Sequence, residues 1–252
     1  MTDGGHGSRE KIKFTNFSKS FGDLLVLDNL NFSVKENDFL CIVGPTGCGK
    51  TTLCNLITTL IPPSKGTVEI NGEPADPRKH NISFVFQEPS CLPWRNVWDD
   101  IKFGLEIKGY SREQIRERVS RIIELVGLKD FVNYYPHQIS AGMKQRVAIA
   151  RAFVTKPDLL LMDEPFGQLD IKTRFYMMDE VIKLWREIKA TIVYVTHNLE
   201  EAIYLGEEVI VLTQKPTHIK STIPVDLSRP RDYSDPKFVE KRKLVTELVK
   251  WW

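Results

Sequence analysis

The sequence predicts an α/β fold, in which a parallel β-sheet with helices on its faces is joined by a small N-terminal antiparallel β subdomain and a helical subdomain. Three observations predict it. Short apolar runs typical of buried strands alternate with stretches of helical periodicity. One of these runs ends in a glycine-rich turn that leads directly into a helix. Alternating apolar and polar residues near the N-terminus, together with an Asn-Gly pair, are typical of antiparallel strands.

Length and composition indicate the class of protein. The chain has 252 residues, of which 42 % are hydrophobic and 27 % charged, as in a globular protein with one large domain or two lobes. The formal net charge of +2 gives no support to a nucleic-acid partner. No apolar run approaches the ~18 residues that cross a bilayer, and the polar N-terminus lacks the apolar segment of a signal peptide. We therefore expect a cytoplasmic protein with a flexible N-terminus over residues 1–10, a main domain over 11–229 and a helical tail over 230–252.

The glycine-rich turn follows five apolar residues, 39–43, that predict a buried strand, and it precedes a predicted helix over 53–60. It fits the pattern G-x-x-x-x-G-K-[ST] of a phosphate-binding loop, or P-loop. Its glycines let amide N–H groups approach a polyanion, which the dipole of the following helix also attracts. Lys50 supplies a compact charge for the β- and γ-phosphates, and the Thr51 hydroxyl suits Mg²⁺. The predicted nucleotide-binding residues of the loop are Gly44, Pro45, Thr46, Gly47, Cys48, Gly49, Lys50, Thr51 and Thr52.

The four cysteines form no C-x-x-C pair, so neither a disulfide framework nor a zinc site is expected. Cys48 lies inside the P-loop, where the simplest interpretation is a small tolerated side chain. A secondary hypothesis is that modification of its thiol blocks nucleotide binding.

Three stretches predict the antiparallel subdomain. Residues 11–17 alternate as in a half-exposed strand, and residues 24–34 are rich in strand formers but broken by polar turns. Residues 67–70 lead into Asn71-Gly72, a strong hairpin signal. Phe21 lies between the first two stretches. Its ring either stacks on the adenine of a nucleotide or belongs to the core or an edge of the sheet, and its spacing favours neither.

A helical subdomain is predicted at about residues 91–150. The apolar strand over 82–86 is followed at once by Gln87, and then by a proline-broken hydrophobic segment over 91–98. From residue 97 to residue 127 apolar side chains recur at helical spacing, with Ser111 as the expected cap of a helix.

Three further apolar strands are predicted over residues 158–162, 191–196 and 208–212, with a helix over 177–188. The order strand, helix, strand implies parallel strands with helices on the faces of the sheet.

The tail predicts one more helix, capped by Ser234 or Asp235 and with Pro236 at its first position. We expect it to pack on the main domain, and docking of a partner is the weaker alternative. The residues that recur at helical spacing are Phe238, Val245, Leu248, Val249 and Trp252.

Four apolar strands each end in a particular polar group: the P-loop, Gln87, Asp163-Glu164 and His197. In open parallel sheets the ligand crevice lies at the carboxyl ends of the strands, so these groups are expected to converge. Their chemistry fits ATP hydrolysis. Asp163 would hold Mg²⁺ through water, and Glu164 would orient or deprotonate the attacking water. Gln87 would report the γ-phosphate or the metal, and His197 would bind the γ-phosphate or hold the water in line.

A second anion signal begins at Ser140, which is followed by Ala141, Gly142 and Met143 and then by a helical pattern over 144–154. A helix N-terminus opened by Ser and Gly binds phosphate. It lies beyond the helical insertion and is expected to be too far from the P-loop of its own chain. It therefore predicts a contribution to the site of a second copy, head to tail, and the alternative is a plain capped helix.

With these motifs the sequence resembles the ATP-binding subunits of ABC transporters, and the resemblance extends from about residue 12 to the tail. Their fold, implied here, is a P-loop NTPase core of the RecA-like type with an antiparallel β and a helical subdomain. Residues 44–52 resemble Walker A, and residues 159–164 resemble Walker B with its catalytic glutamate. Gln87 matches the Q-loop and His197 the switch histidine. The resemblance also implies nucleotide contacts from the adenine-stacking position Phe21, from Ser140, Gly142 and Met143 of the signature motif, and from Asp170 of the D-loop.

The resemblance narrows to the nitrate, sulfonate and taurine class of bacterial importers. It rests on Gln87-Glu88-Pro89 with Leu92-Pro93-Trp94, on Met143 and on the tail over residues 231–239. Ala141 replaces the usual first glycine of the signature, and Gln168 stands where alanine is usual in the D-loop.

The resemblance implies a dimer in which ATP and Mg²⁺ are bound between the P-loop of one copy and the Ser140 motif of the other. The second subunit is another copy or a homologous ATPase. The segment over 91–98 is expected to receive a separate transmembrane permease at the cytoplasmic face of the membrane. A substrate-binding protein outside the cell would act indirectly.

Three alternatives remain. One is an ABC-type ATPase that acts on DNA or ribosomes, although the near-neutral charge and the single nucleotide domain disfavour it. Another is an exporter ATPase. The third is a P-loop kinase, which would leave the Ser140 motif and the Glu164 and His197 pair unexplained.

Overall fold

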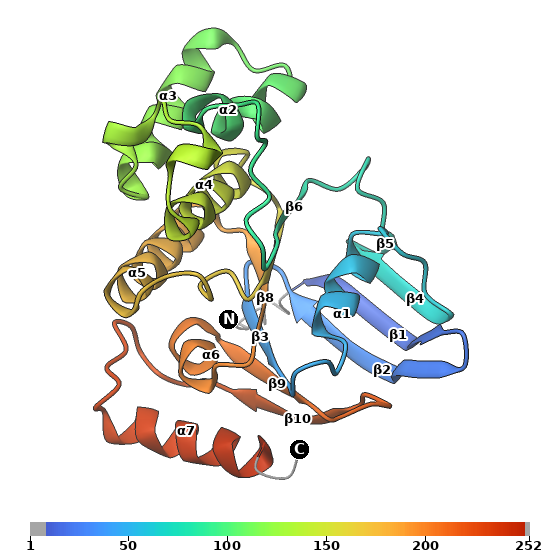
Figure 1. The fold of residues 1–252 in the computed structure, drawn as a ribbon. Coiled ribbons are helices and arrows are strands. Elements are labelled where there is room, and N and C mark those ends of the chain that lie inside the picture. Colours follow the sequence, from blue (N-terminus) through green and yellow to red (C-terminus); the bar gives the residue numbers. More distant parts are fainter. Residues whose placement is uncertain (1–8, 250–252) are drawn as a thin grey trace, which may run out of the picture. The chain divides into compact units, whose positions relative to one another are not determined.

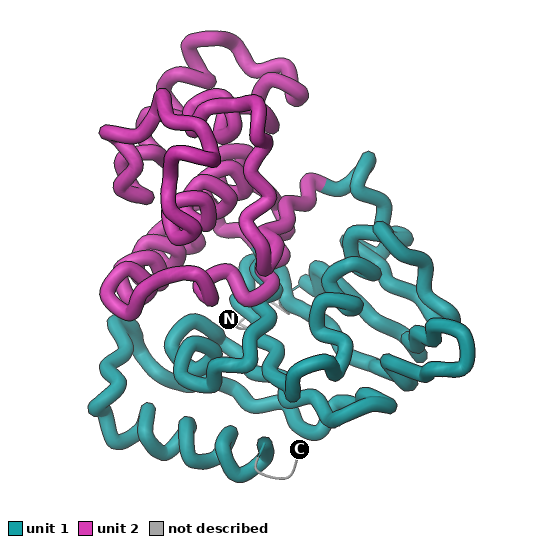
Figure 2. Tube along the Cα trace, viewed as in Figure 1, with its two compact units in different colours: residues 1–80, 191–252 teal, residues 81–190 magenta. Residues whose placement is uncertain are grey.

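The computed structural model describes residues 9–249, and the chain divides into two compact units. Figure 2 draws them in teal (residues up to 80 and from 191) and magenta (residues 81–190). The predicted flexible segment, 1–10, lies outside the described residues except for Arg9 and Glu10, and Glu10 already begins a strand. The predicted domain boundaries stay predictions.

The first unit contains an antiparallel sheet in the order β2-β1-β4-β5. Phe14 of β1 lies opposite Phe32 of β2, and their rings stack with centroids 4.1 Å apart. Both residues of the predicted Asn71-Gly72 hairpin turn have positive φ, at 55° and 80°, as a tight turn between β4 and β5 requires. The strands are β1 (Glu10–Phe21), β2 (Leu24–Lys35), β4 (Lys65–Ile70) and β5 (Glu73–Pro74).

The predicted interruptions between residues 24 and 34 are absent, because β2 runs without a break. Asn29 within it has φ 50°, and the pairing with β1 shifts register nearby. A bulge therefore accommodates the polar residues inside the strand and no turn forms.

The second sheet of this unit has the order β10-β9-β3-β8. Strand β3 (Phe39–Val43) is parallel to both β8 (Thr191–Thr196) and β9 (Glu208–Leu212), and every residue of β3 and β8 is buried. Strand β10 (Ile219–Pro224) is antiparallel to β9. The sequence did not predict β10, because its polar residues and terminal proline suit an edge strand and give little apolar signal.

Three helices belong to the first unit. Helix α1 (Lys50–Ile57) follows the P-loop and begins three residues before the predicted range. Helix α6 (Leu199–Leu205) follows β8. Helix α7 (Pro236–Val249) begins at the predicted proline and packs on α6 and β9 through buried Phe238 and Val245 (Figure 1). This confirms that the tail covers its own unit, and Trp252 lies outside the described residues.

The second unit contains the parallel strands β6 (Ile82–Val85) and β7 (Leu159–Asp163) and is otherwise helical. Ser111 caps its second helix through a capping box with Gln114, as predicted for the serine. The helices are α2 (Val97–Ile107), α3 (Arg112–Leu125), α4 (Ala141–Val154) and α5 (Ile171–Ile188), with short 3₁₀ turns η1 (Lys129–Phe131) and η2 (Pro136–Gln138).

The predicted start of α5 at residue 177 is wrong by six residues. Asp170 caps the helix by accepting a hydrogen bond from the Thr173 amide, at 3.0 Å. Ile171 in the first turn is 72 % exposed, so this part of the helix lacks the apolar periodicity on which the prediction depended. Among the described residues no helix is long and apolar enough to cross a membrane.

Candidate nucleotide site

The P-loop connects buried β3 to α1 in the first unit. Gly47 and Gly49 have φ of 79° and 110°, in the region that favours glycine. A Cβ at Gly49 would lie 2.8 Å from Val26 Cγ1 and 2.9 Å from Leu27 Cδ2. Glycine is therefore required there both by the backbone angle and by the lack of space.

The first turn of α1 has no side-chain cap and no acidic residue. In five other helices an Asn, Ser or Asp oxygen accepts a first-turn amide, and these caps are Asn96, Ser111, Ser140, Asp170 and Asn198. The amide groups and the positive end of the α1 dipole thus suit an external anion, and the residues present fit a triphosphate. Thr51 in this turn is exposed.

Lys50 places its ammonium group over the loop. The side chain is buried, and Nζ donates hydrogen bonds to the carbonyl oxygens of Gly44 at 2.9 Å and Pro45 at 3.1 Å. The loop backbone therefore holds the positive charge close to the amide cradle before any phosphate binds.

Cys48 lies on the inner side of the loop. Its side chain is buried, and this burial raises the pKa of the thiol. The Thr217 hydroxyl donates to its carbonyl oxygen. A buried thiol with little thiolate reacts slowly, which disfavours the hypothesis of a thiol switch.

Phe21 ends β1 and is 48 % exposed, so the interpretation as a core residue is wrong. The Lys19 ammonium lies 4.9 Å from the ring centroid and also donates to the carbonyl oxygen of Pro62 at 2.7 Å. Lys19 therefore fixes the ring at the end of the strand, and adenine stacking and a sheet-edge role both remain compatible with its position.

His197 directly follows β8 and is exposed. A buried carboxylate, Glu201, fixes the backbone on both sides of it. The hydroxyl groups of Tyr194 and Thr196 donate to Glu201 Oε2 at 2.6 and 3.1 Å, and Asn198 donates to its other oxygen at 3.3 Å. The sequence did not predict this hydrogen-bond network, although Asn198 and Glu201 have the spacing of a capping box.

The second unit brings Gln87 and Glu164 together. Gln87 Nε2 donates to Glu164 Oε2 at 3.3 Å. Asp163, the last residue of β7, is buried, and Glu164 follows it with φ 45°. A left-handed backbone at a non-glycine residue is strained and is concentrated at functional sites.

The same unit brings the signature residues and the D-loop together. Ser140 Oγ accepts a hydrogen bond from the Met143 amide at 3.2 Å and so caps α4, as predicted. A Cβ on Gly142 would lie 3.4 Å from the carbonyl oxygen of Gln168, so the two segments are in close contact. Between them lies a pocket of about 340 Å³, lined by Ser140, Ala141, Gly142, Met143, Arg146, Gln168, Leu169, Asp170 and Thr173.

The Asp170 carboxylate in this pocket already caps α5, because it accepts a hydrogen bond from the Thr173 amide. Hydrogen bonds from Thr173 lower the pKa of Asp170, so the group is ionised at neutral pH.

The predicted site residues thus form two groups. The first unit contains the P-loop, Phe21 and His197, and the second contains Gln87, Asp163, Glu164 and the Ser140 motif with Asp170. Of the three predicted holders of Mg²⁺, Thr51 belongs to the first unit, and Gln87 and Asp163 belong to the second.

Comparison with known proteins places these features in a family. The model of the family described as ABC transporter matches residues 27–167. An uncharacterized ABC transporter ATP-binding protein of Methanocaldococcus jannaschii is 42 % identical over 244 residues, covering 95 % of this chain and 91 % of that protein. The aliphatic sulfonates import ATP-binding protein of Bacillus subtilis is 40 % identical over 220 residues, covering 87 % and 85 %.

A solved structure gives the same result. It is an ATP-binding cassette in a dimeric post-hydrolysis state, bound to ADP and Pi. Its sequence is 32 % identical to this chain, the TM-score is 0.77, and the match covers 86 % of this chain and 100 % of that chain.

Proposed function

The chain belongs to the ABC transporter family, and from that premise we propose that it powers an importer of a small anion or organic solute. It is an ATPase of this family, with ATP as its substrate. The observation that carries the nucleotide chemistry is the uncapped first turn of α1 with Lys50 held over the loop. The resemblance to aliphatic sulfonate import proteins supports a cargo of the nitrate, sulfonate or taurine type.

We propose that two copies bind head to tail, so that the P-loop of one and the Ser140 motif of the other enclose each ATP. Ser140 lies in a pocket with Gly142 and Asp170 in the second unit, and no P-loop residue lines that pocket. The dimeric state of the structural relative supports this arrangement. A homologous ATPase subunit in place of the second copy would satisfy the same geometry.

The proposed reaction is attack of water on the γ-phosphorus. The new P–O bond forms as the bond to the β,γ-bridging oxygen breaks, and Glu164 takes a proton from the water. Lys50 and the amides of the loop and of α1 bind the β- and γ-phosphates. His197, held by the Glu201 network, donates a hydrogen bond to the γ-phosphate.

Gln87 has a second role in this scheme. Its Nε2 donates one hydrogen bond to Glu164 in the structure, and its second N–H and its carbonyl oxygen would serve the γ-phosphate or the metal. Thr51, Gln87 and Asp163 would hold Mg²⁺, which would neutralise charge on the phosphate oxygens.

We propose that a transmembrane permease docks on the second unit at the cytoplasmic face of the membrane. The surface that supports this is the segment before α2, where Trp94 is 71 % exposed. Large exposed aromatic side chains are typical anchors of protein interfaces. A substrate-binding protein outside the cell would deliver the cargo and would not touch this chain.

Copurification tests the proposal. The chain should be isolated with a multispan membrane protein, and the reconstituted complex should hydrolyse ATP faster with a sulfonate or nitrate and its binding protein outside. A Trp94→Ala variant should lose the membrane subunit and keep ATP binding, whereas Phe175→Ala, a control that changes an exposed aromatic of α5 in the same unit, should keep both. Retention of the membrane subunit by Trp94→Ala, or purification with DNA or ribosomes in its place, would contradict it.

A further inference from the structure

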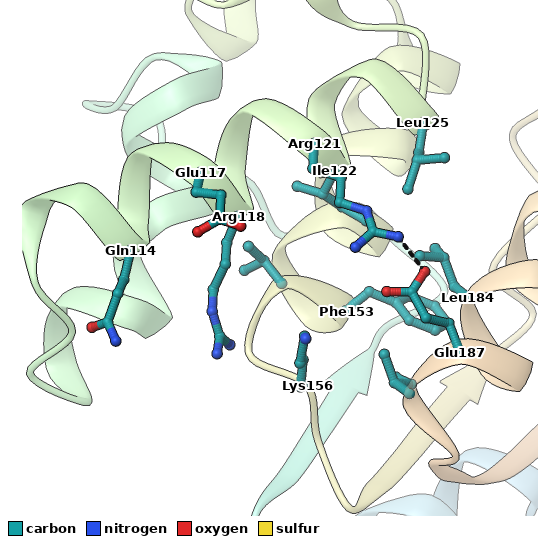
Figure 3. A pocket seen from close by; sticks show the side chains of 12 residues that line it. Gln114, Glu117, Arg118, Arg121, Ile122, Leu125, Phe153, Lys156, Leu184 and Glu187 are labelled. Atoms are coloured by element: carbon teal, nitrogen blue, oxygen red, sulfur yellow. Dashed lines mark hydrogen bonds and ion pairs between the residues drawn. The ribbon is translucent and has the colours of Figure 1, made fainter.

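The second unit has a pocket of about 220 Å³ that shares no residue with the predicted nucleotide site. It is lined by α3, by the C-terminal end of α4 and by the last turns of α5 (Figure 3). An engineered protein cavity of about 150 Å³ holds benzene, so this pocket has room for a slightly larger molecule.

The inner wall of the pocket is apolar. Ile122 of α3, Phe153 and Val154 of α4 and Leu184 of α5 are all buried side chains. An apolar group placed against this wall would be removed from water, which is favourable.

The rim of the pocket is charged, with an excess of positive groups. Arg121 of α3 pairs with Glu187 of α5, as the dashed line in Figure 3 shows. The other charged groups on the rim are Arg118 and Lys156, which are positive, and Glu117, which is negative. The site therefore has a net positive charge after the ion pair is counted.

Arg118 has an unused hydrogen-bond donor. Its Nη1 atom is buried and has no partner among the described residues, while its Cζ lies 4.5 Å from the centroid of the Tyr110 ring. In Figure 3 its guanidinium extends from α3 between Gln114 and Lys156. A buried donor without an acceptor is costly, and a shift of the Arg118 side chain toward the pocket that it lines would let a bound anion supply the acceptor.

The pKa of the neighbouring Lys108 is lowered mainly by burial of its ammonium group, and nearby charges of both signs also act on it. Of these charges, Asp158 raises the pKa of Lys108 and Arg118 lowers it. Asp158 is thus an acidic group that partly offsets the positive charges of Lys108 and Arg118.

We propose that this pocket binds a small amphiphilic monoanion, in which a carboxylate or sulfonate group is attached to a short apolar chain. The anionic head accepts hydrogen bonds from Arg118 and Lys156, and the chain lies against Ile122, Phe153 and Leu184. Charge-assisted hydrogen bonds of this kind are about twice as strong as neutral ones.

The position of the pocket links it to ATP turnover, and this link rests on the proposed function. Helix α4 begins at the Ser140 cap and α5 begins at the Asp170 cap, and both end at the pocket. An anion bound there contacts the far ends of the two helices whose first turns would meet the nucleotide of the other copy. Its binding therefore changes the rate of ATP hydrolysis.

The binding test uses the full chain without nucleotide and follows titration with hexanoate and with butane-1-sulfonate by calorimetry. We expect saturable binding of one anion per chain, with hexan-1-ol binding at least roughly tenfold more weakly because it lacks the charged head. Arg118→Gln and Lys156→Gln should each weaken binding of the anions by roughly tenfold. Arg116→Gln, an exposed change on the same helix, is the control and should leave the affinity unchanged.

Three results would overturn the proposed site: no saturable binding of either anion, equal binding of hexan-1-ol, or an equal loss of affinity in Arg116→Gln. Lys156 is exposed, so its substitution keeps the test valid even where Arg118→Gln folds poorly.

The regulatory consequence has its own test. Saturating hexanoate should change the steady-state rate of ATP hydrolysis by the wild-type chain and have a much smaller effect on Lys156→Gln at the same concentration. An unchanged wild-type rate with hexanoate bound would overturn the link between the pocket and turnover. Absence of ATP hydrolysis without hexanoate would instead contradict the proposed function, so the two failures are distinguishable.

Discussion

Glu164 combines three features that single it out at the scale of the residue. It follows a fully buried strand, it has a left-handed backbone with φ 45°, and its carboxylate accepts a hydrogen bond from Gln87. Strain at a non-glycine residue persists only where the surrounding structure enforces it. A carboxylate with a fixed position and a neutral amide partner fits a general base whose orientation is set before the substrate arrives.

Substitution of Glu164 by Gln should lower kcat for ATP hydrolysis by at least about 100-fold, because general-base catalysis typically contributes 10²–10⁴. The affinity for ATP should stay the same, since the phosphates bind to the loop. Phosphate release and nucleotide binding measure the two effects. Glu113→Gln, an exposed carboxylate in the first turn of α3, is the control with normal turnover. Wild-type turnover in Glu164→Gln would remove this residue from its proposed role.

Lys50 belongs to the binding side of the same site. Lys50→Ala should weaken ATP binding by roughly tenfold or more, because it removes a charge-assisted hydrogen bond to phosphate. Fluorescent-nucleotide titration of the variant, with exposed Lys65→Ala as a control, measures this effect. Equal affinity in Lys50→Ala and wild type would show that the ammonium does not reach the phosphates.

At the scale of the element, helix α4 holds the segment that carries Gln87. Gln145 Nε2 donates to the carbonyl oxygen of Phe86 at 3.3 Å, one residue before Gln87. Arg151 donates to the carbonyl oxygen of Ser90 at 2.8 Å and to the buried carboxylate of Asp100 at 2.7 Å. Helix α4 therefore holds the segment over residues 86–90 at both of its ends.

Arg151→Ala should lower the free energy of unfolding by about 3–5 kcal/mol, because it leaves the Asp100 carboxylate buried without its cation. Urea unfolding followed by circular dichroism measures the change. Arg116→Ala, on the exposed side of α3, should change the stability by less than about 0.5 kcal/mol. A similar small change in Arg151→Ala would mean that the ion pair does not fasten the segment.

The elements show which parts of this structure a sequence can predict. The P-loop, the Ser111 and Ser140 caps and the Asn71-Gly72 turn were predicted correctly, because each depends on local backbone chemistry. Strand β10 was missed because its polar residues and terminal proline give little apolar signal, and the first turns of α5 were missed because their exposed residues lack periodicity.

The long-range contacts of the site could not be predicted in the same way. Arg151 and Asp100 are 51 positions apart, and neither residue type indicates its partner. The contact between Gln87 and Glu164 spans 77 positions, and the sequence indicated only that both residues end strands. The neighbours of such side chains are set by packing in three dimensions, which periodicity does not encode.

At the scale of the whole molecule, the site that we propose is completed only by a second copy. Ser140 caps α4 in one chain, and its motif would bind the γ-phosphate held by the P-loop of the other. ATP would then act as part of the interface, and hydrolysis would release the dimer. Because Glu164→Gln slows hydrolysis but spares binding, it should accumulate the closed state.

The most direct test is the molar mass of Glu164→Gln by light scattering, with and without saturating ATP and Mg²⁺. We predict that the mass doubles with ATP and that an added Ser140→Ala change prevents the doubling. An added Ser111→Ala change, which removes a comparable helix cap worth about 1 kcal/mol, should leave the dimer intact. A monomer at saturating ATP, or a dimer that forms equally well without the Ser140 hydroxyl, would contradict the shared site.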